Sequence, residues 1–205
     1  VLGPNHPATV RLIFTLGLGY SFNFQPEKGA PLVAAALERS SSVLGAQHPQ
    51  TLQLMSLLGH TRSYLNEFEE AEALSLHGLK LRREILGEEH LLTINSMVIL
   101  ARTYVQQRQF TNAEPLTERV LSLGQRLPLE NGLFTHFNVG ILGWFYLEQG
   151  HVDEAATLCE LAVQATRRKP DGNPLANASS IIHLGAVRLA QERYAEAEKL
   201  LREGS

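Results

Sequence analysis

The sequence of 205 residues lacks the features that mark several large classes of protein. Its one cysteine, Cys159, cannot form a disulfide within the chain, which fits the reducing cytoplasm. No segment approaches the roughly 18 consecutive apolar residues of a membrane span, and no signal peptide is visible. The formal net charge of −3 supplies no overall basic field, so binding to nucleic acid is not expected. We therefore expect a cytoplasmic protein with neither nucleic acid nor membrane as a partner.

Motifs of enzyme and cofactor sites are missing as well. The sequence has no glycine-rich phosphate loop, no zincin or paired-cysteine motif, and no Gly-x-Ser-x-Gly. Cys159 lies between Leu158 and Leu161, and a cysteine in such an apolar segment is more often a small buried hydrophobe than a nucleophile. The sequence therefore predicts no catalytic residue, no cofactor and no enzymatic activity.

What the sequence does contain is a phrase that returns every 42 residues. It begins at Val1, Val43 and Ile85, and each copy continues with Leu-Gly and then a histidine five residues after its start. Leu-Gly or Leu-Ala pairs keep the same interval through the chain, beginning at positions 16, 58, 100, 142 and 184. A fixed period of this length indicates a stacked array in which neighbouring units share their apolar faces.

Each period has the pattern of two helices joined by a short turn. In the second period, Leu54, Leu57, Leu58 and Leu65 recur at helical intervals, and the following segment 68–86 begins acidic and ends basic, as the helix dipole favours. The sequence therefore predicts an all-α solenoid of about five helix-turn-helix repeats that form a single array over residues 1–205. The expected repeats span approximately residues 7–44, 49–86, 91–126, 133–168 and 175–205.

Two further expectations concern small residues and the chain ends. The small residue of each Leu-Gly or Leu-Ala pair falls in the middle of a first helix, where glycine costs about 1 kcal/mol relative to alanine. Close approach of a second helix is the expected compensation. The chain starts inside the repeat phrase and stops just after its last amphipathic segment. We therefore expect a fragment of a longer protein, with uncapped ends.

The repeats resemble the tetratricopeptide repeat (TPR). Leu100, Ala101, Tyr104 and Ala113 match its Leu-Gly/Ala, Tyr and Ala positions, and the 42-residue length with its Leu-Gly-x-x-His-Pro-x-Thr junction is similar to the subtype of kinesin light chains. The resemblance implies a right-handed superhelix whose first helices line a concave groove that holds extended peptides or helices. Two copies of the tyrosine position hold Arg62 and Arg188 instead. Because a buried arginine needs a partner, we expect these two side chains to reach solvent or the groove.

The groove-facing positions that the family implies give the candidate binding residues. Exposed aromatic and arginine side chains on such a face are common interface anchors. Arginines at these positions, with Arg62 nearby, favour an acidic ligand or a C-terminal carboxylate. The alternative, equally favoured, is that Trp144 and Phe137 only pack between adjacent helices. The candidates are Arg11, Phe14, Phe22, His60, Tyr64, Asn95, Arg102, Phe137 and Trp144.

The histidines of the repeated phrase, His6, His48 and His90, pose a choice between metal binding and helix capping. Equivalent residues of stacked repeats lie roughly 10 Å apart, about one helix-packing distance, which is too far for them to share one ion. Capping and turn packing at the helix start are therefore the favoured interpretation, and no metal site is predicted.

The leading functional hypothesis is a non-catalytic protein–protein interaction scaffold. It binds a peptide or helix in the concave groove, supplied by another protein or intramolecularly by another segment of the parent chain. The alternative is an array that self-associates through its uncapped ends, or that spaces and regulates an effector domain of a larger signalling protein.

Overall fold

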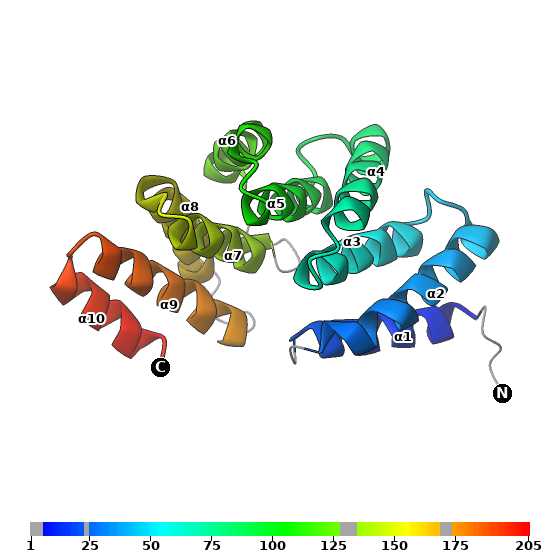
Figure 1. Cartoon of the computed structure of the whole chain (residues 1–205), viewed down its shortest axis with the longest axis horizontal. Coiled ribbons are helices and arrows are strands. Elements are labelled where there is room, and N and C mark those ends of the chain that lie inside the picture. The colour runs from blue at the N-terminus through cyan, green and yellow to red at the C-terminus, as the bar shows by residue number, and fades with distance from the viewer. Residues whose placement is uncertain (1–5, 23–24, 128–134, 169–173) are drawn as a thin grey trace. The chain divides into compact units, whose positions relative to one another are not determined.

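A computed structural model describes residues 6–22, 25–127, 135–168 and 174–205, which form ten α-helices and no strand (Figure 1). The helices follow one another in pairs, each joined by a short turn. The prediction of an all-α repeat solenoid is therefore confirmed. The helices are α1 (Pro7–Phe22), α2 (Pro26–Leu44), α3 (Pro49–Tyr64), α4 (Phe68–Leu86), α5 (Leu91–Gln106), α6 (Phe110–Arg126), α7 (Thr135–Glu148), α8 (Val152–Arg168), α9 (Pro174–Ala190) and α10 (Tyr194–Glu203).

The chain divides into two compact units, residues 1–87 and residues 88–205. The first unit holds α1 to α4, and the second holds α5 to α10. In both units the two helices of a repeat pack on each other, and in the second unit the first helices also pack side by side, α5 on α7 and α7 on α9. The first helices of the second unit therefore form a continuous layer.

The repeated histidine starts the first helix of a repeat. The Nδ1 atom of His48 accepts a hydrogen bond from the backbone N–H of Gln50 at 3.2 Å, and His90 Nδ1 accepts one from Leu92 at the same distance. His6 makes the equivalent bond to Ala8 at 3.1 Å. Each imidazole thus satisfies one of the backbone donors that a helix start leaves unpaired. The capping interpretation of the histidine phrase is confirmed.

The turn inside each of the second to fifth repeats contains a residue with left-handed backbone conformation. Asn66, Arg108, Gly150 and Glu192, each 42 residues apart, have φ values of 61°, 58°, 86° and 59°. This conformation disfavours most side chains, and asparagine and glycine tolerate it best. The turn therefore has a fixed geometry in four repeats, although two of its four residues are poor choices for it.

Small residues allow the two helices of a repeat to approach closely. A Cβ atom added at Gly143 on α7 would lie 2.6 Å from Cys159 Sγ and 3.2 Å from the carbonyl oxygen of Ala155, both on α8. A Cβ at Gly17 would lie 2.4 Å from Val33 Cγ2 on α2. The expectation that close approach explains these glycines is confirmed.

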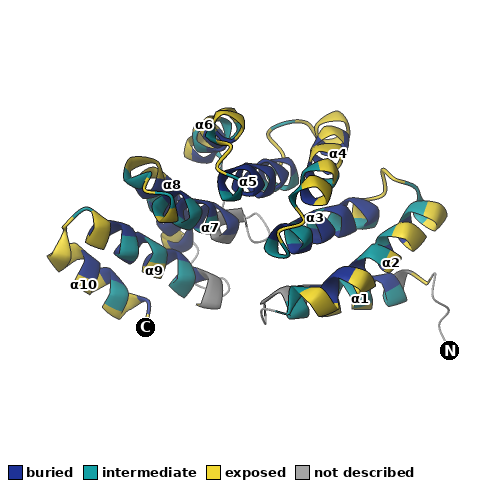
Figure 2. Cartoon of the chain, in the orientation of Figure 1, coloured by how far each residue is buried: buried dark blue, intermediate teal, exposed yellow. Residues whose placement is uncertain are grey.

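Burial follows the same register along the chain (Figure 2). The alanine column on the second helices, Ala71, Ala113, Ala155 and Ala197, is completely buried. Helix α5 is the most enclosed first helix, and Figure 2 shows it almost wholly in dark blue. Among the described residues, no helix is long and apolar enough to cross a membrane.

Candidate functional site

In the first unit, the predicted groove residues lie on α1 and α3. Arg11 is exposed, whereas Phe14 is half-buried against the apolar cluster formed by α1, α2 and α3. His60 and Tyr64 pack edge to face on α3, with ring centroids 4.8 Å apart and planes inclined by 77°. The side chain of Phe22 lies outside the described residues. The structure therefore brings together only His60 and Tyr64 of this group, one turn apart on one helix.

In the second unit, Asn95 belongs to a polar contact between neighbouring first helices. The Nδ2 atom of Asn138 on α7 donates a hydrogen bond to Oδ1 of Asn95 on α5, at 2.6 Å. Asn138 itself is buried, and Asn95 is half-buried. Asn138 was not among the residues predicted from the sequence. The side chain of Phe137, the predicted residue beside it, lies outside the described residues.

Trp144 on α7 packs against His183 on α9. The ring centroids lie 5.5 Å apart with planes inclined by 30°, and both side chains are half-buried. A Cβ added at Gly140 would lie 3.5 Å from His183 Nδ1, an ordinary van der Waals distance, so the imidazole packs beside the Gly140 backbone. Trp144 therefore packs between adjacent helices, as one alternative had it, and still keeps part of its surface open.

His183 was missed from the sequence, although the repeat register contained a signal. Leu57, Ile99 and Ile141 occupy the same register position in the second, third and fourth repeats, so His183 is a polar residue where those three repeats have an apolar one. Burial lowers the pKa of His183 to about 4, against a smaller opposing effect of the Gly140 carbonyl. The imidazole is therefore neutral at pH 7, and its contact with the indole is one between two uncharged rings.

Arg102 departs from the position expected of a groove residue. It is 1% exposed, and its guanidinium carbon lies 6.0 Å from the ring centroid of Phe145 on α7, which is a cation–π distance. The aliphatic stem and planar head of arginine pack well against an aromatic ring, so this side chain joins the protein interior. Arg102 is not on the open part of the α5 surface.

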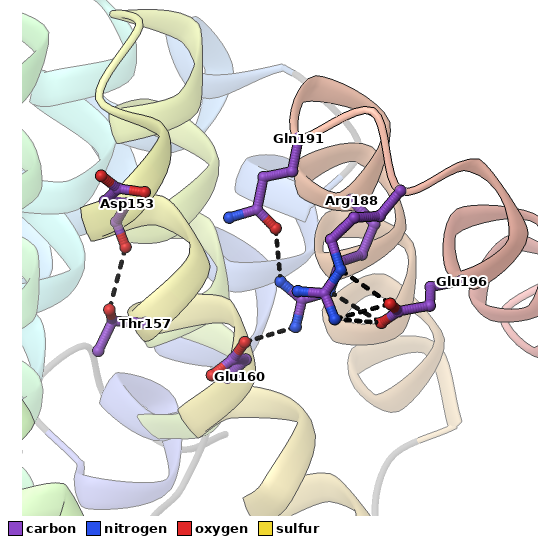
Figure 3. Close-up of polar contacts among 7 residues, drawn as sticks. Asp153, Thr157, Glu160, Arg188, Gln191 and Glu196 are labelled. Atoms are coloured by element: carbon purple, nitrogen blue, oxygen red, sulfur yellow. Dashed lines mark hydrogen bonds and ion pairs between the residues drawn. The ribbon is translucent and has the colours of Figure 1, made fainter.

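Arg188 on α9 is likewise buried, which corrects the expectation that it reaches solvent or the groove. Its guanidinium contacts the carboxylate of Glu160 on α8, donates to Gln191 Oε1 at 2.7 Å and lies 3.5 Å from a carboxylate oxygen of Glu196 on α10 (Figure 3). The side chain keeps 8% of its surface exposed. Carboxylates from two other helices supply the partners that allow an arginine to be buried here.

Arg62 on α3 has two carboxylate partners from its own repeat. It contacts Glu67, and its Nε atom lies 3.1 Å from Glu70 on α4. Its side chain is 23% exposed, so it reaches solvent as expected. Of the three arginines that suggested an acidic ligand, Arg62 is paired to these carboxylates and Arg102 lies in the interior. Arg11 is the exposed member of the three.

Cys159 on α8 is buried. Burial raises the pKa of Cys159 to about 12, so the thiol stays protonated and behaves as the small buried hydrophobe expected of it. Its Sγ atom lies 3.8 Å from the Gly140 carbonyl oxygen. Within the described part of the chain, no three His, Cys, Asp or Glu side chains gather as metal ligands would.

Comparison with known proteins identifies the repeat. The sequence profile of the tetratricopeptide repeat matches residues 24–84 and 66–126, which together cover half of the chain. The chain belongs to the tetratricopeptide repeat family. TPR proteins serve in general as protein–protein interaction scaffolds, and they are typically not enzymes. No curated protein sequence matches the chain.

Solved TPR structures share the fold. Crystal structures of nearly identical TPR-like repeats, from a protein assigned as a kinesin light chain in Podosopora anserina, superimpose with a TM-score of 0.66 at 21% and 23% identity. They cover 100% and 97% of this chain, and 95% and 94% of their own. BtubC (BKLC) from P. vanneervenii has a TM-score of 0.67 at 26% identity, over 96% of this chain and 78% of its own. The resemblance to kinesin-light-chain-like TPR proteins is confirmed.

The TPR register explains where Arg62 and Arg188 lie. Both replace the family tyrosine, whose role is visible at Tyr146, where the phenol oxygen lies 3.1 Å from Thr117 Oγ1 on the second helix of the preceding repeat. Arg188 also reaches back to a preceding second helix, through Glu160. This TPR position therefore joins successive repeats, by a phenol in one copy and by an ion pair in another.

Proposed function

We propose that the chain is a non-catalytic scaffold that binds an extended peptide segment along α5, α7 and α9. We define the candidate binding face as Asn95, Trp144 and His183, one residue from each of these first helices. The three residues are half-buried, so each combines a fixed position with an open surface. The Trp144–His183 contact is the observation that carries the proposal, because it places an open aromatic pair across two packed first helices.

The chemistry of the face suits a peptide better than a charged ligand. The amide of Asn95 offers a donor and an acceptor, which match the backbone groups of an extended segment. Trp144 and the neutral His183 offer apolar ring surface for a side-chain anchor. Because Arg102 is buried, we propose recognition by aromatic and amide contacts rather than by an arginine cluster.

The single tryptophan makes the proposal directly testable. A displayed library of random 12-residue peptides would be selected against the 205-residue chain, and the enriched peptides titrated while the emission of Trp144 is recorded. We expect saturable changes in that emission. Trp144→Phe would remove the fluorescence signal, so the affinity is tested with Asn95→Ala and His183→Leu, which both keep the tryptophan. Each of these two variants should bind the peptide about tenfold more weakly, a loss of about 1.4 kcal/mol.

A matched control uses an exposed aromatic residue elsewhere in the second unit. Tyr194 on α10 is largely exposed and lies outside the candidate binding face, so Tyr194→Ala should leave the affinity unchanged. Selected peptides that bind with unaltered Trp144 emission, or whose affinity is insensitive to both Asn95→Ala and His183→Leu, would refute this face as the binding site.

A further inference from the structure

Arg82 on α4 is a charged side chain enclosed in the first unit, with 3% of its surface exposed. Its Nη1 atom donates a hydrogen bond to the Ser56 hydroxyl oxygen at 2.5 Å, and its Nη2 atom donates to the Leu52 carbonyl oxygen at 2.7 Å, both on α3. Burial lowers the pKa of Arg82 to about 10, so the guanidinium is still charged at pH 7. A positive charge is therefore held inside the repeat, in contact with the hydroxyl of Ser56.

Both residues of this contact are particular to the second repeat. The positions equivalent to Arg82 in the first, third and fourth repeats hold Ser40, Gly124 and Thr166. Those equivalent to Ser56 hold Phe14, Val98, Gly140 and Ile182. An enclosed charge costs free energy of solvation, which a neutral residue at the same position does not. Because departures of this kind gather at functional sites, the contact points to a role in binding.

The contact with Arg82 also leaves the hydroxyl proton of Ser56 available. A serine inside a helix commonly donates to the carbonyl four residues earlier, as Ser96 does to Leu92 at 3.0 Å. At Ser56 that carbonyl belongs to Leu52, which accepts from Arg82 instead. A hydroxyl that accepts a hydrogen bond from a guanidinium keeps its own proton to donate. Ser56 can therefore donate to a group outside the helix while the charge of Arg82 lies on its other side.

Ser56 lies on a partly open face of α3. Gln53, Ser56 and His60 are spaced three and four residues apart, so they share one side of the helix, and each is half-buried. The side-chain amide of Gln53 adds N–H donors one turn from the Ser56 hydroxyl. A hydroxyl and an amide donor in front of a poorly solvated positive charge favour an oxygen atom that carries negative charge.

We propose that Ser56 and Gln53 bind one oxyanion group of a partner, whose negative charge is stabilised by the enclosed Arg82. A carboxylate of an acidic side chain and a phosphate of a phosphorylated side chain share this chemistry. Ser56 and Gln53 donate the hydrogen bonds, and Arg82 is a positioning residue that acts through Ser56. The site lies in the first unit and uses none of Asn95, Trp144 and His183, so it stands or falls separately from the proposed peptide-binding face.

The test titrates the isotope-labelled chain with sodium acetate and, separately, with sodium phosphate, at neutral pH and constant ionic strength. Chemical shifts of the backbone amides report binding. We expect a saturable shift centred on Ser56, with a Kd of about 10 mM for the better anion. Tighter binding of acetate indicates a carboxylate ligand, and tighter binding of phosphate indicates a phosphorylated one. A titration in which neither anion saturates on α3 overturns the proposal.

Variants separate the site from general electrostatic attraction. Ser56→Ala removes the hydroxyl donor and Arg82→Gln removes the charge, and each should weaken binding at least about tenfold, whereas Ser56→Thr keeps the donor and should retain binding. Arg83→Gln is the matched control, because Arg83 is the exposed neighbour and its loss changes the net charge equally. Equal losses from Arg82→Gln and Arg83→Gln would overturn the proposal. Circular dichroism checks folding, and if Arg82→Gln unfolds, the comparison of Ser56→Ala with Ser56→Thr decides.

Discussion

The second repeat, α3 with α4, and the fifth, α9 with α10, are the two copies in which arginine replaces the TPR tyrosine. Arg62 and Arg188 are 126 residues apart, three periods, and their partners Glu70 and Glu196 are separated by the same interval. The additional carboxylates differ. Arg62 takes Glu67 from the turn of its own repeat, whereas Arg188 takes Glu160 from the second helix of the preceding one.

This difference sets the burial of the two arginines. Arg62 stays at the edge of its repeat, where solvent screens its ion pairs. Arg188 is enclosed between three helices and depends on Glu160 to offset the cost of burying its charge. The same substitution in the same register is therefore a local surface feature in one repeat and a connection between repeats in the other. The role of a residue at a given register position therefore depends on the side chains that the neighbouring repeat places beside it.

The largest expected effect on stability comes from removing Glu160, the carboxylate that Arg188 takes from the preceding repeat. Glu160→Ala leaves Arg188 enclosed with a reduced set of acceptors, so we expect the free energy of unfolding to fall by about 2 kcal/mol. Glu67→Ala, the matched change beside Arg62, should cost less than about 1 kcal/mol. Urea unfolding monitored by circular dichroism measures both. Equal losses from the two variants would contradict the distinction between the repeats.

A second effect depends on pH and on His183, whose counterpart in the second repeat is Leu57. The folded pKa of about 4 lies below the ordinary 6.5, so the unfolded state binds a proton between these values and the folded state does not. Stability should fall as the pH drops from 6.5 to 4 and be unaffected by this group above 6.5. Because the ring is partly exposed, we expect a loss of about 1 to 2 kcal/mol.

His183→Leu gives this position an apolar residue, as in the second, third and fourth repeats, and should abolish that part of the acid sensitivity. Unfolding curves of the wild type and of His183→Leu, recorded at pH 7, 6, 5 and 4, measure this contribution. The difference in free energy of unfolding between the two proteins should change progressively below pH 6.5. A difference that is constant with pH would show that His183 is protonated equally in both states.

A smaller effect tests the helix caps. His48 caps α3 in the second repeat, whereas the equivalent position of the fifth is Pro174, the first residue of α9. His48→Ala should destabilise the protein by about 1 kcal/mol, and His48→Asn, which keeps a capping acceptor, should restore most of that loss. Thermal unfolding of the two variants is a sufficient measurement. Equal melting temperatures of His48→Ala and His48→Asn would contradict a capping role for the His48 side chain.

The smallest effect concerns the left-handed turn residue. Asn66 tolerates its conformation, whereas Glu192 in the fifth repeat is strained by it. We expect Glu192→Gly to stabilise the protein by about 1 kcal/mol and Asn66→Gly to change it by less than about 0.5 kcal/mol. Urea midpoints of the two variants compare the turns directly, and a stabilisation that is larger at Asn66 would reverse this ranking.

The fold was predictable because the information that specifies each helix pair is local and is repeated. The 42-residue register located the helix pairs, the caps and the close approaches at small residues. The surroundings of individual side chains were harder to predict from the sequence. Arg102 occupies a predicted groove position, but its burial beside Phe145 depends on a residue 43 positions later. Glu160, which determines the environment of Arg188, belongs to another repeat. Such pairings depend on side-chain directions across helices, which periodicity alone does not specify.

The constant turn inside each repeat has a consequence for changing the length of this protein. In all five repeats the first helix ends and the second begins four residues later, for example at Tyr64 and Phe68 or at Ala190 and Tyr194. The two junctions between repeats that the structure describes in full, Leu44 to Pro49 and Leu86 to Leu91, also have one common spacing. An epitope tag or a fluorescent domain inserted after Tyr64 should therefore disrupt a repeat, because it separates two helices whose spacing is fixed.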